Sequence, residues 1–266
     1  DVASLCVKFD ILGLRTLSVV HAVCEQLGIK ADEIDVKDPT IYSALACLEQ
    51  PQGLFQIEAD TNFKVCKLIR PRNLEELSAV VAIARPGALD FKDRYADYVR
   101  TGDFQSVHPF FDDVLSYTGG IPLYQEQLMK MAVKVGFSLD ESEQLRRIVG
   151  KKKVDQMVAW KDKISQKISE NNLDPVIGEI LWKVAEDSAN YSFNKSHSIS
   201  YANLAAITIY LKFNYPQEFF LNLMKFAQFE PDPLQEIHKI SQELSFFDIK
   251  LLPPDLNKSD IDFKIE

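Results

Sequence analysis

The stretch 191–201 gathers side chains that can hold an anion. It contains Asn194, Lys195 and His197 with several serines, and it lies between two segments rich in apolar residues. At the start of a helix the first backbone N–H groups are free to donate, and the helix dipole favours negative charge there. Lys195 adds a positive charge, and Ser196, Ser198 and His197 add hydrogen-bond donors. This stretch therefore suggests a phosphate-binding cradle.

The same residue types also allow simpler interpretations. Ser196 or Ser198 can be an ordinary N-cap, because serine is common at that position. The ammonium group of Lys195 can be solvated. The basic run 151–153 can contact phosphate, or it can be a solvated turn between two helices.

Helical patterns flank the polar stretch on both sides. Residues 175–189 carry apolar side chains on one helix face, and residues 199–213 are apolar nearly all round, which predicts a buried helix. Capping residues predict helix starts at Asn73, Ser138 and Asp174, and the last of these precedes Pro175. Further helices are expected over 14–27, 40–48, 60–68, 91–100, 123–135, from 154 to about 170, and after Pro216 and Pro233. A short strand is expected near residues 5–10, and 88–119 should be mostly loops.

Composition limits the function classes. Apolar residues make up 46% and charged residues 26%, as in an ordinary soluble globular protein, and no run reaches a membrane-spanning length. The net charge of −9 excludes a protein whose whole surface binds nucleic acid, although basic residues cluster at 146–147 and 151–153. The four cysteines are widely spaced, which favours reduced thiols and a cytoplasmic chain over a zinc site or disulfides.

Several segments resemble one protein family. The run Phe193-Asn194-Lys195-Ser196-His197-Ser198 with Tyr201-Ala202 resembles the FNKSHS–AYA motif in the fingers of bacterial replicative DNA polymerase III alpha subunits, the C-family polymerases. Other segments that resemble this family follow in family order, at 7–17, 55–58, 84–87, 124–129, 145–153, 215–219 and 252–255. The resemblance covers nearly the whole chain.

The resemblance implies a mainly α fold: a helical fingers domain with a short palm strand remnant, from a nucleotidyltransferase-like palm, at the N-terminus. The expected segments are the end of the palm and a connecting helix over 1–28, the fingers over 29–250 and an exit segment over 251–266. One departure from the family pattern follows Arg85. The small-residue turn expected after the RPGPL-like segment is replaced by Asp90-Phe91-Lys92-Asp93.

The resemblance also assigns site residues. Asp10 corresponds to the third metal-binding carboxylate of a two-Mg²⁺ site, of which this chain would carry one ligand, and Lys8 is counted as catalytic beside it. The residues expected to bind nucleotide or DNA are Arg85, Arg146, Arg147, Lys151, Lys152, Asn194, Lys195, Ser196 and His197. We expect their positive charges to meet around one hollow that fits a triphosphate.

The function implied is part of a DNA-directed DNA polymerase that incorporates dNTPs on a template by two-metal phosphoryl transfer. This chain alone is expected to be inactive, because no Asp-x-Asp precedes Asp10. The expected partners are primer-template DNA, dNTPs and the remaining palm, thumb and PHP segments, with the sliding clamp and other replisome subunits reached through other regions and no membrane. The alternative is a non-catalytic nucleotide- or DNA-binding module, or a helical interaction subunit.

Overall fold

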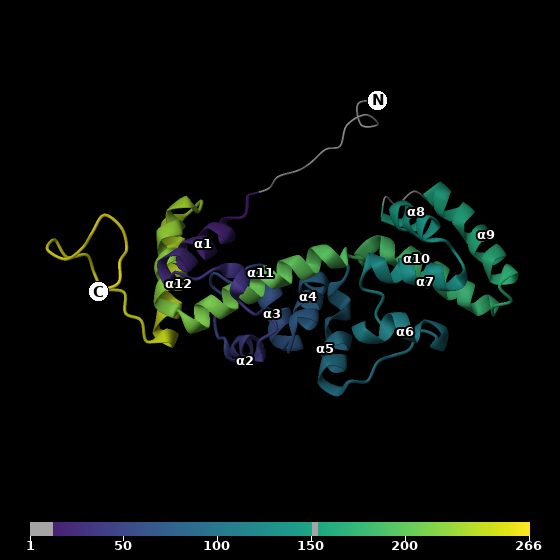
Figure 1. Ribbon diagram of the computed structural model, residues 1–266, viewed down its shortest axis with the longest axis horizontal. Helices are drawn as coiled ribbons and strands as arrows, with labels where there is room; N and C mark the ends of the chain where they lie inside the picture. Colours follow the sequence, from purple (N-terminus) through teal and green to yellow (C-terminus); the bar gives the residue numbers. More distant parts are fainter. Residues whose placement is uncertain (1–12, 151–153) are drawn as a thin grey trace, which may run out of the picture. The chain divides into compact units, whose positions relative to one another are not determined.

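A computed structural model of the chain describes residues 13–150 and 154–266 (Figure 1). Within these residues the regular elements are helices, and one isolated parallel β-bridge pairs Tyr124 with Phe193. The mainly α fold class is therefore confirmed. The expected palm strand falls on residues 5–10, which lie outside the described residues.

The chain forms two compact units. The central unit comprises Val36–Ala206, and the terminal unit combines residues up to Asp35 with Ile207–Glu266. The division falls inside α11 (Lys195–Asn214). Besides the start of α11, the helices of the central unit are α2 (Pro39–Cys47), α3 (Asp60–Ile69), α4 (Leu74–Ile83), α5 (Lys92–Thr101), α6 (Asp112–Leu115), α7 (Gln125–Val135), α8 (Leu139–Gly150), α9 (Val154–Glu170) and α10 (Pro175–Tyr191). Those of the terminal unit are α1 (Arg15–Leu27), α12 (Pro216–Phe226) and α13 (Pro233–Leu244), besides the end of α11.

The main core of the central unit lies among α7, α8, α9 and α10, which pack together (Figure 1). In α7 the buried residues Leu128, Met131, Ala132 and Val135 recur with the spacing of one helix face. Burying such a face removes apolar surface from water, which is the main force holding a short helix in place. The start of α7 is thereby fixed, and this helix start belongs to the candidate site.

Local signals explain where the helices begin. The Asp174 carboxylate accepts a hydrogen bond from the Val176 N–H at 2.9 Å, ahead of Pro175 at the first helical position. Ser138 and Glu141 bond each other's backbone N–H groups, which confirms that capping box.

At α4 only half of the expected capping box forms. The Asn73 side chain accepts from the Glu76 N–H, but the Glu76 carboxylate accepts from the Arg72 N–H instead of the Asn73 N–H.

Two expectations differ from the structure. The buried helix was expected from residue 199, but α11 begins at Lys195, because the polar residues 195–198 form its first turn. The region 88–119, expected to hold one helix among loops, also contains α6 and 3-10 turns at Leu89–Phe91, Pro109–Phe111 and Ser116–Thr118. These segments are too short to show a periodic apolar pattern.

The terminal unit has a core of its own, formed by Phe220, Met224, Ala227, Ile240 and Leu244, and α1 packs against α12 (Figure 1). No helix in the described part of the chain has both the length and the apolar content needed to cross a membrane.

Candidate functional site

Two helix starts lie side by side in the central unit. The Phe193 N–H donates to the Leu123 carbonyl at 3.1 Å, and the Gln125 N–H donates to the Phe193 carbonyl at 2.9 Å. This pairing holds the residue before α7 next to the residues before α11. The positive ends of two helix dipoles therefore converge on one small region, which favours negative charge. We call this region the paired helix starts, residues 123–127 and 193–198.

The start of α11 is capped from within the protein. The Asn194 side chain accepts hydrogen bonds from the His197 N–H at 2.8 Å and from the Ser196 hydroxyl at 2.6 Å. The Lys195 N–H donates to both carboxylate oxygens of Glu126, at 3.0 and 3.2 Å. The interpretation of Ser196 or Ser198 as the N-cap is therefore wrong, since Asn194 takes that role. The expectation of free N–H groups is also wrong at Lys195 and His197.

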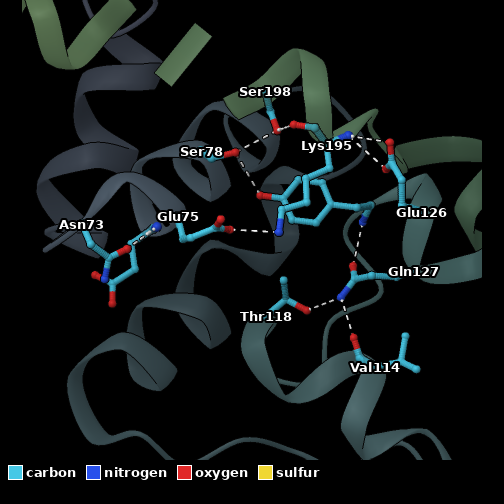
Figure 2. Close-up of polar contacts among 11 residues, drawn as sticks. Asn73, Glu75, Ser78, Val114, Thr118, Glu126, Gln127, Lys195 and Ser198 are labelled. Carbon is cyan, nitrogen blue, oxygen red and sulfur yellow. Dashed lines mark hydrogen bonds and ion pairs between the residues drawn. The ribbon is translucent and has the colours of Figure 1, made fainter. Parts of the chain in front are cut away.

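The Lys195 side chain extends away from the helix start and is 30% exposed (Figure 2). Its ammonium group pairs with the Glu75 carboxylate at 3.0 Å and lies 4.7 Å from the ring centre of Tyr117 and 5.7 Å from that of Tyr124. A ring face attracts a cation, and more so where water is partly excluded. Lys195 is therefore a positioned cation, and the interpretation of a freely solvated ammonium is wrong.

A buried polar network supports this cation from below. The Tyr124 hydroxyl lies 3.3 Å from the Ser78 hydroxyl, which lies 2.9 Å from the Ser198 hydroxyl (Figure 2). Ser78 and Ser198 are fully buried. Burial raises the pKa of Tyr124 to about 12, so its hydroxyl stays protonated at neutral pH.

The backbone at Tyr124 is fixed by the same kind of network. The Gln127 side-chain oxygen accepts from the Tyr124 N–H at 2.8 Å, and its amide donates to Thr118 at 2.7 Å and to the Val114 carbonyl at 3.3 Å (Figure 2). Because buried polar groups that are fully paired rigidify their surroundings, the paired helix starts have a defined geometry.

Arg85 lies against the residue that joins the two helix starts. Its guanidinium carbon is 3.9 Å from the ring centre of Phe193, and it donates to the carbonyls of Tyr191 at 2.8 Å and Ala82 at 3.1 Å. Burial lowers the pKa of Arg85, but an arginine so far above neutral pH keeps its charge. Among the described ion pairs, Arg85 has no carboxylate partner, so its charge is not neutralised locally.

Arg146 reaches the same region from α8, whereas Arg147 does not. Arg146 donates to the side-chain oxygen of Gln125 at 3.0 Å and forms two bonds of 2.6 Å with Glu143. Arg147 is 67% exposed and pairs with Glu143 alone. The two arginines, Arg146 before Arg147, lower the pKa of the Glu143 carboxyl to about 2.

The contacts thus bring together Arg85, Arg146, Asn194, Lys195 and His197 around the paired helix starts, and Ser196 and His197 are exposed there. The His197 ring lies 5.4 Å from the Phe193 ring and 4.1 Å from the Tyr201 ring. Lys8, Asp10, Lys151 and Lys152 lie outside the described residues. Sequence reasoning missed the carboxylates of Glu75 and Glu143, and it quoted Glu126 only within a motif.

The nearest pocket is elsewhere. A pocket of about 490 Å³ lies beside the turn after Arg85, and its lining includes Gly87, Phe91, Arg94 and Lys183. That lining contains none of the residues predicted to bind nucleotide. The predicted cations instead surround the two helix starts.

Metal ligands are not grouped in the described part of the chain. Across residues 13–150 and 154–266, no three His, Cys, Asp or Glu side chains come together in a way that would hold an ion. Asp10, the carboxylate expected to bind metal, precedes this part, so its role stays a prediction.

Comparison with known proteins places this geometry in a family. Residues 16–172 match the family model described as the bacterial DNA polymerase III alpha subunit finger domain. The chain is 34% identical over 265 residues to the DNA polymerase III subunit alpha of Chlamydia muridarum, 33% over 271 residues to that of Thermus aquaticus, and 35% over 271 residues to that of Aquifex aeolicus. Each alignment covers 97% of this chain but 21%, 22% and 23% of the respective relative. The chain spans about a fifth of the length of these relatives.

Proposed function

This chain belongs to the finger domain family of bacterial DNA polymerase III alpha subunits, and we propose that its paired helix starts bind the triphosphate of an incoming deoxynucleotide. The observation that carries the proposal is the convergence of α7 and α11 at their N-termini, with Lys195, Arg85 and Arg146 around them. Helix starts and cations from separate elements make a site for a strongly charged anion.

The side chains would divide the work by their chemistry. Lys195 would contact the triphosphate as a point charge, and Arg146 would offer planar donors once a phosphate competes with Glu143. Arg85 holds the Phe193 backbone in place and adds positive potential. The exposed His197 would donate to phosphate from the first turn of α11.

The reaction proposed for the whole polymerase is template-directed incorporation of dNTPs. Asp10, with Lys8 beside it, would supply one carboxylate for Mg²⁺, which when bound would activate the primer hydroxyl and neutralise the triphosphate. In this scheme the described residues orient the nucleotide and hold its charge. Primer-template DNA, the other polymerase segments, a cytoplasmic location, the segment boundaries 1–28, 29–250 and 251–266, and inactivity of the chain alone belong to the same proposal.

Binding of dATP to the 266-residue chain tests the site. We expect Lys195→Ala to weaken dATP binding roughly tenfold, because a charge-assisted contact to phosphate is lost. Lys183→Ala, which removes an exposed lysine of α10, is the matched control and should leave affinity unchanged. Isothermal titration at low salt gives both values. Equal affinities for the two variants would move the nucleotide site elsewhere.

A further inference from the structure

Glu126 lies at the position that most favours an anion. It is in the first turn of α7, and its carboxylate accepts the first N–H of α11, so the positive ends of both helices act on it. Arg146 and Glu126 also attract each other electrostatically. The carboxylate thus occupies the place that a phosphate group would take in the proposed site (Figure 2).

A phosphate and Glu126 cannot both use this position. The Lys195 N–H makes its hydrogen bonds to the two oxygens of one carboxylate, and a phosphate brought within reach of that N–H would stand against the same carboxylate. Two negative groups at contact distance repel, and the repulsion is stronger where water is partly excluded. The side chain must therefore turn away before a phosphate binds.

We infer that Glu126 is an affinity-determining residue of the nucleotide site, acting as an internal competitor that holds the start of α11 until a phosphate displaces its carboxylate. This inference rests on the proposed function, because it concerns the same site.

Glu75 also faces the site but carries less weight. It pairs with the Lys195 ammonium, yet its side chain is 60% exposed, so water and salt screen its charge. Glu126 differs because it bonds a backbone N–H, which cannot move away without moving α11. Removal of the Glu126 charge should therefore have the larger effect on nucleotide affinity.

The substitution Glu126→Gln tests this directly. Glutamine keeps an oxygen that can accept the Lys195 N–H but removes the negative charge. We expect dATP to bind at least roughly fivefold more tightly in the absence of Mg²⁺ at low salt, with the gain shrinking as salt rises. Glu186→Gln removes the same charge from an exposed position on α10 and should change affinity less than twofold.

A measurement on the unaltered chain makes the test independent of the variant's folding. The carbon resonance of the Glu126 carboxylate, followed by NMR during a dATP titration, should move toward that of a free glutamate as the side chain is released. Thermal unfolding of Glu126→Gln separates capping from competition, because a group that only caps α11 would lower stability without raising affinity.

The outcomes distinguish the inference from the proposed function. Tighter binding by Glu126→Gln, with no change for Glu186→Gln, supports the inference. If Glu126→Gln binds dATP as the natural chain does or more weakly, while Lys195→Ala weakens binding, the inference is overturned and the nucleotide site stands. If neither the natural chain nor Glu126→Gln binds dATP, both are overturned.

Discussion

At Lys195 the side chain and the backbone have separate acidic partners. The ammonium group pairs with Glu75, and the N–H pairs with Glu126. A phosphate that approaches this residue would exchange both contacts for its own oxygens. The residue is therefore already desolvated and oriented before a ligand arrives, which lowers the entropy cost of binding.

Tyr124, beneath Lys195, predicts how stability depends on alkaline pH. Burial raises its pKa to about 12, so the folded protein holds this proton more tightly than the unfolded chain, in which tyrosine titrates near pH 10. The contribution to stability is complete below pH 10 and is lost as pH rises through about 12. We expect the free energy of unfolding, measured in urea, to fall over this range.

The variant Tyr124→Phe isolates this residue. Because it cannot ionise, it should lose less stability between pH 10 and pH 12 than the natural chain does. Tyr98→Phe, in the same unit, is the control, since no hydrogen bond of its hydroxyl is part of the network. A fall of the same steepness in Tyr124→Phe would mean that other groups, such as Tyr191, govern alkaline unfolding.

At the scale of elements, α11 has a different environment at each end. Its start carries the candidate site, and near its end Lys212 forms an ion pair of 2.6 Å with Glu243 of α13, with exposures of 0% and 1%. The rings of Phe220 and Phe247 lie 5.5 and 5.9 Å from the same ammonium. Such a pair costs desolvation, but losing one partner costs more, because the other charge is left buried.

We therefore expect Lys212→Met to destabilise the terminal unit by about 3–5 kcal/mol, and a second change, Glu243→Leu, to restore most of that loss. Far-UV circular dichroism in urea measures the effect. Both tryptophans of the sequence, Trp160 and Trp182, lie in the central unit, so their fluorescence reports that unit separately. A loss under 1 kcal/mol for Lys212→Met would contradict a stabilising role for the pair.

How much of the elements was predictable depends on how local their signals are. Asp174 with Pro175, and Ser138 with Glu141, act on neighbouring N–H groups, so the helix starts could be placed from sequence. The start of α11 could not, because its first turn carries polar residues that look like a loop. Asn194 gives the signal that was missed, since it is a strong N-cap residue.

The candidate site shows the same limit at longer range. The run 194–197 was predictable, because its residue types suit an anion and match a family motif. Its acidic partners were not, because Glu126 and Lys195 are 69 residues apart and meet only through the pairing of Phe193 with Leu123 and Gln125. No local pattern encodes such a contact.

For the whole molecule, charge has to be considered by region. The net charge of −9 argues against general binding of nucleic acid, yet Arg85, Arg146 and Lys195 contact one small region of the central unit. Only the surface that meets phosphate needs to be positive. The proposed function therefore requires nucleotide to bind at one place in the central unit and to leave the terminal unit unaffected.

Mapping amide resonances of the whole chain by NMR during a dATP titration tests this most directly. The account predicts that the largest shifts fall on Lys195, Ser196 and His197 and on the first turn of α7, with little change in α12 and α13. Shifts concentrated around Arg94 and Lys183, or within the terminal unit, would contradict it.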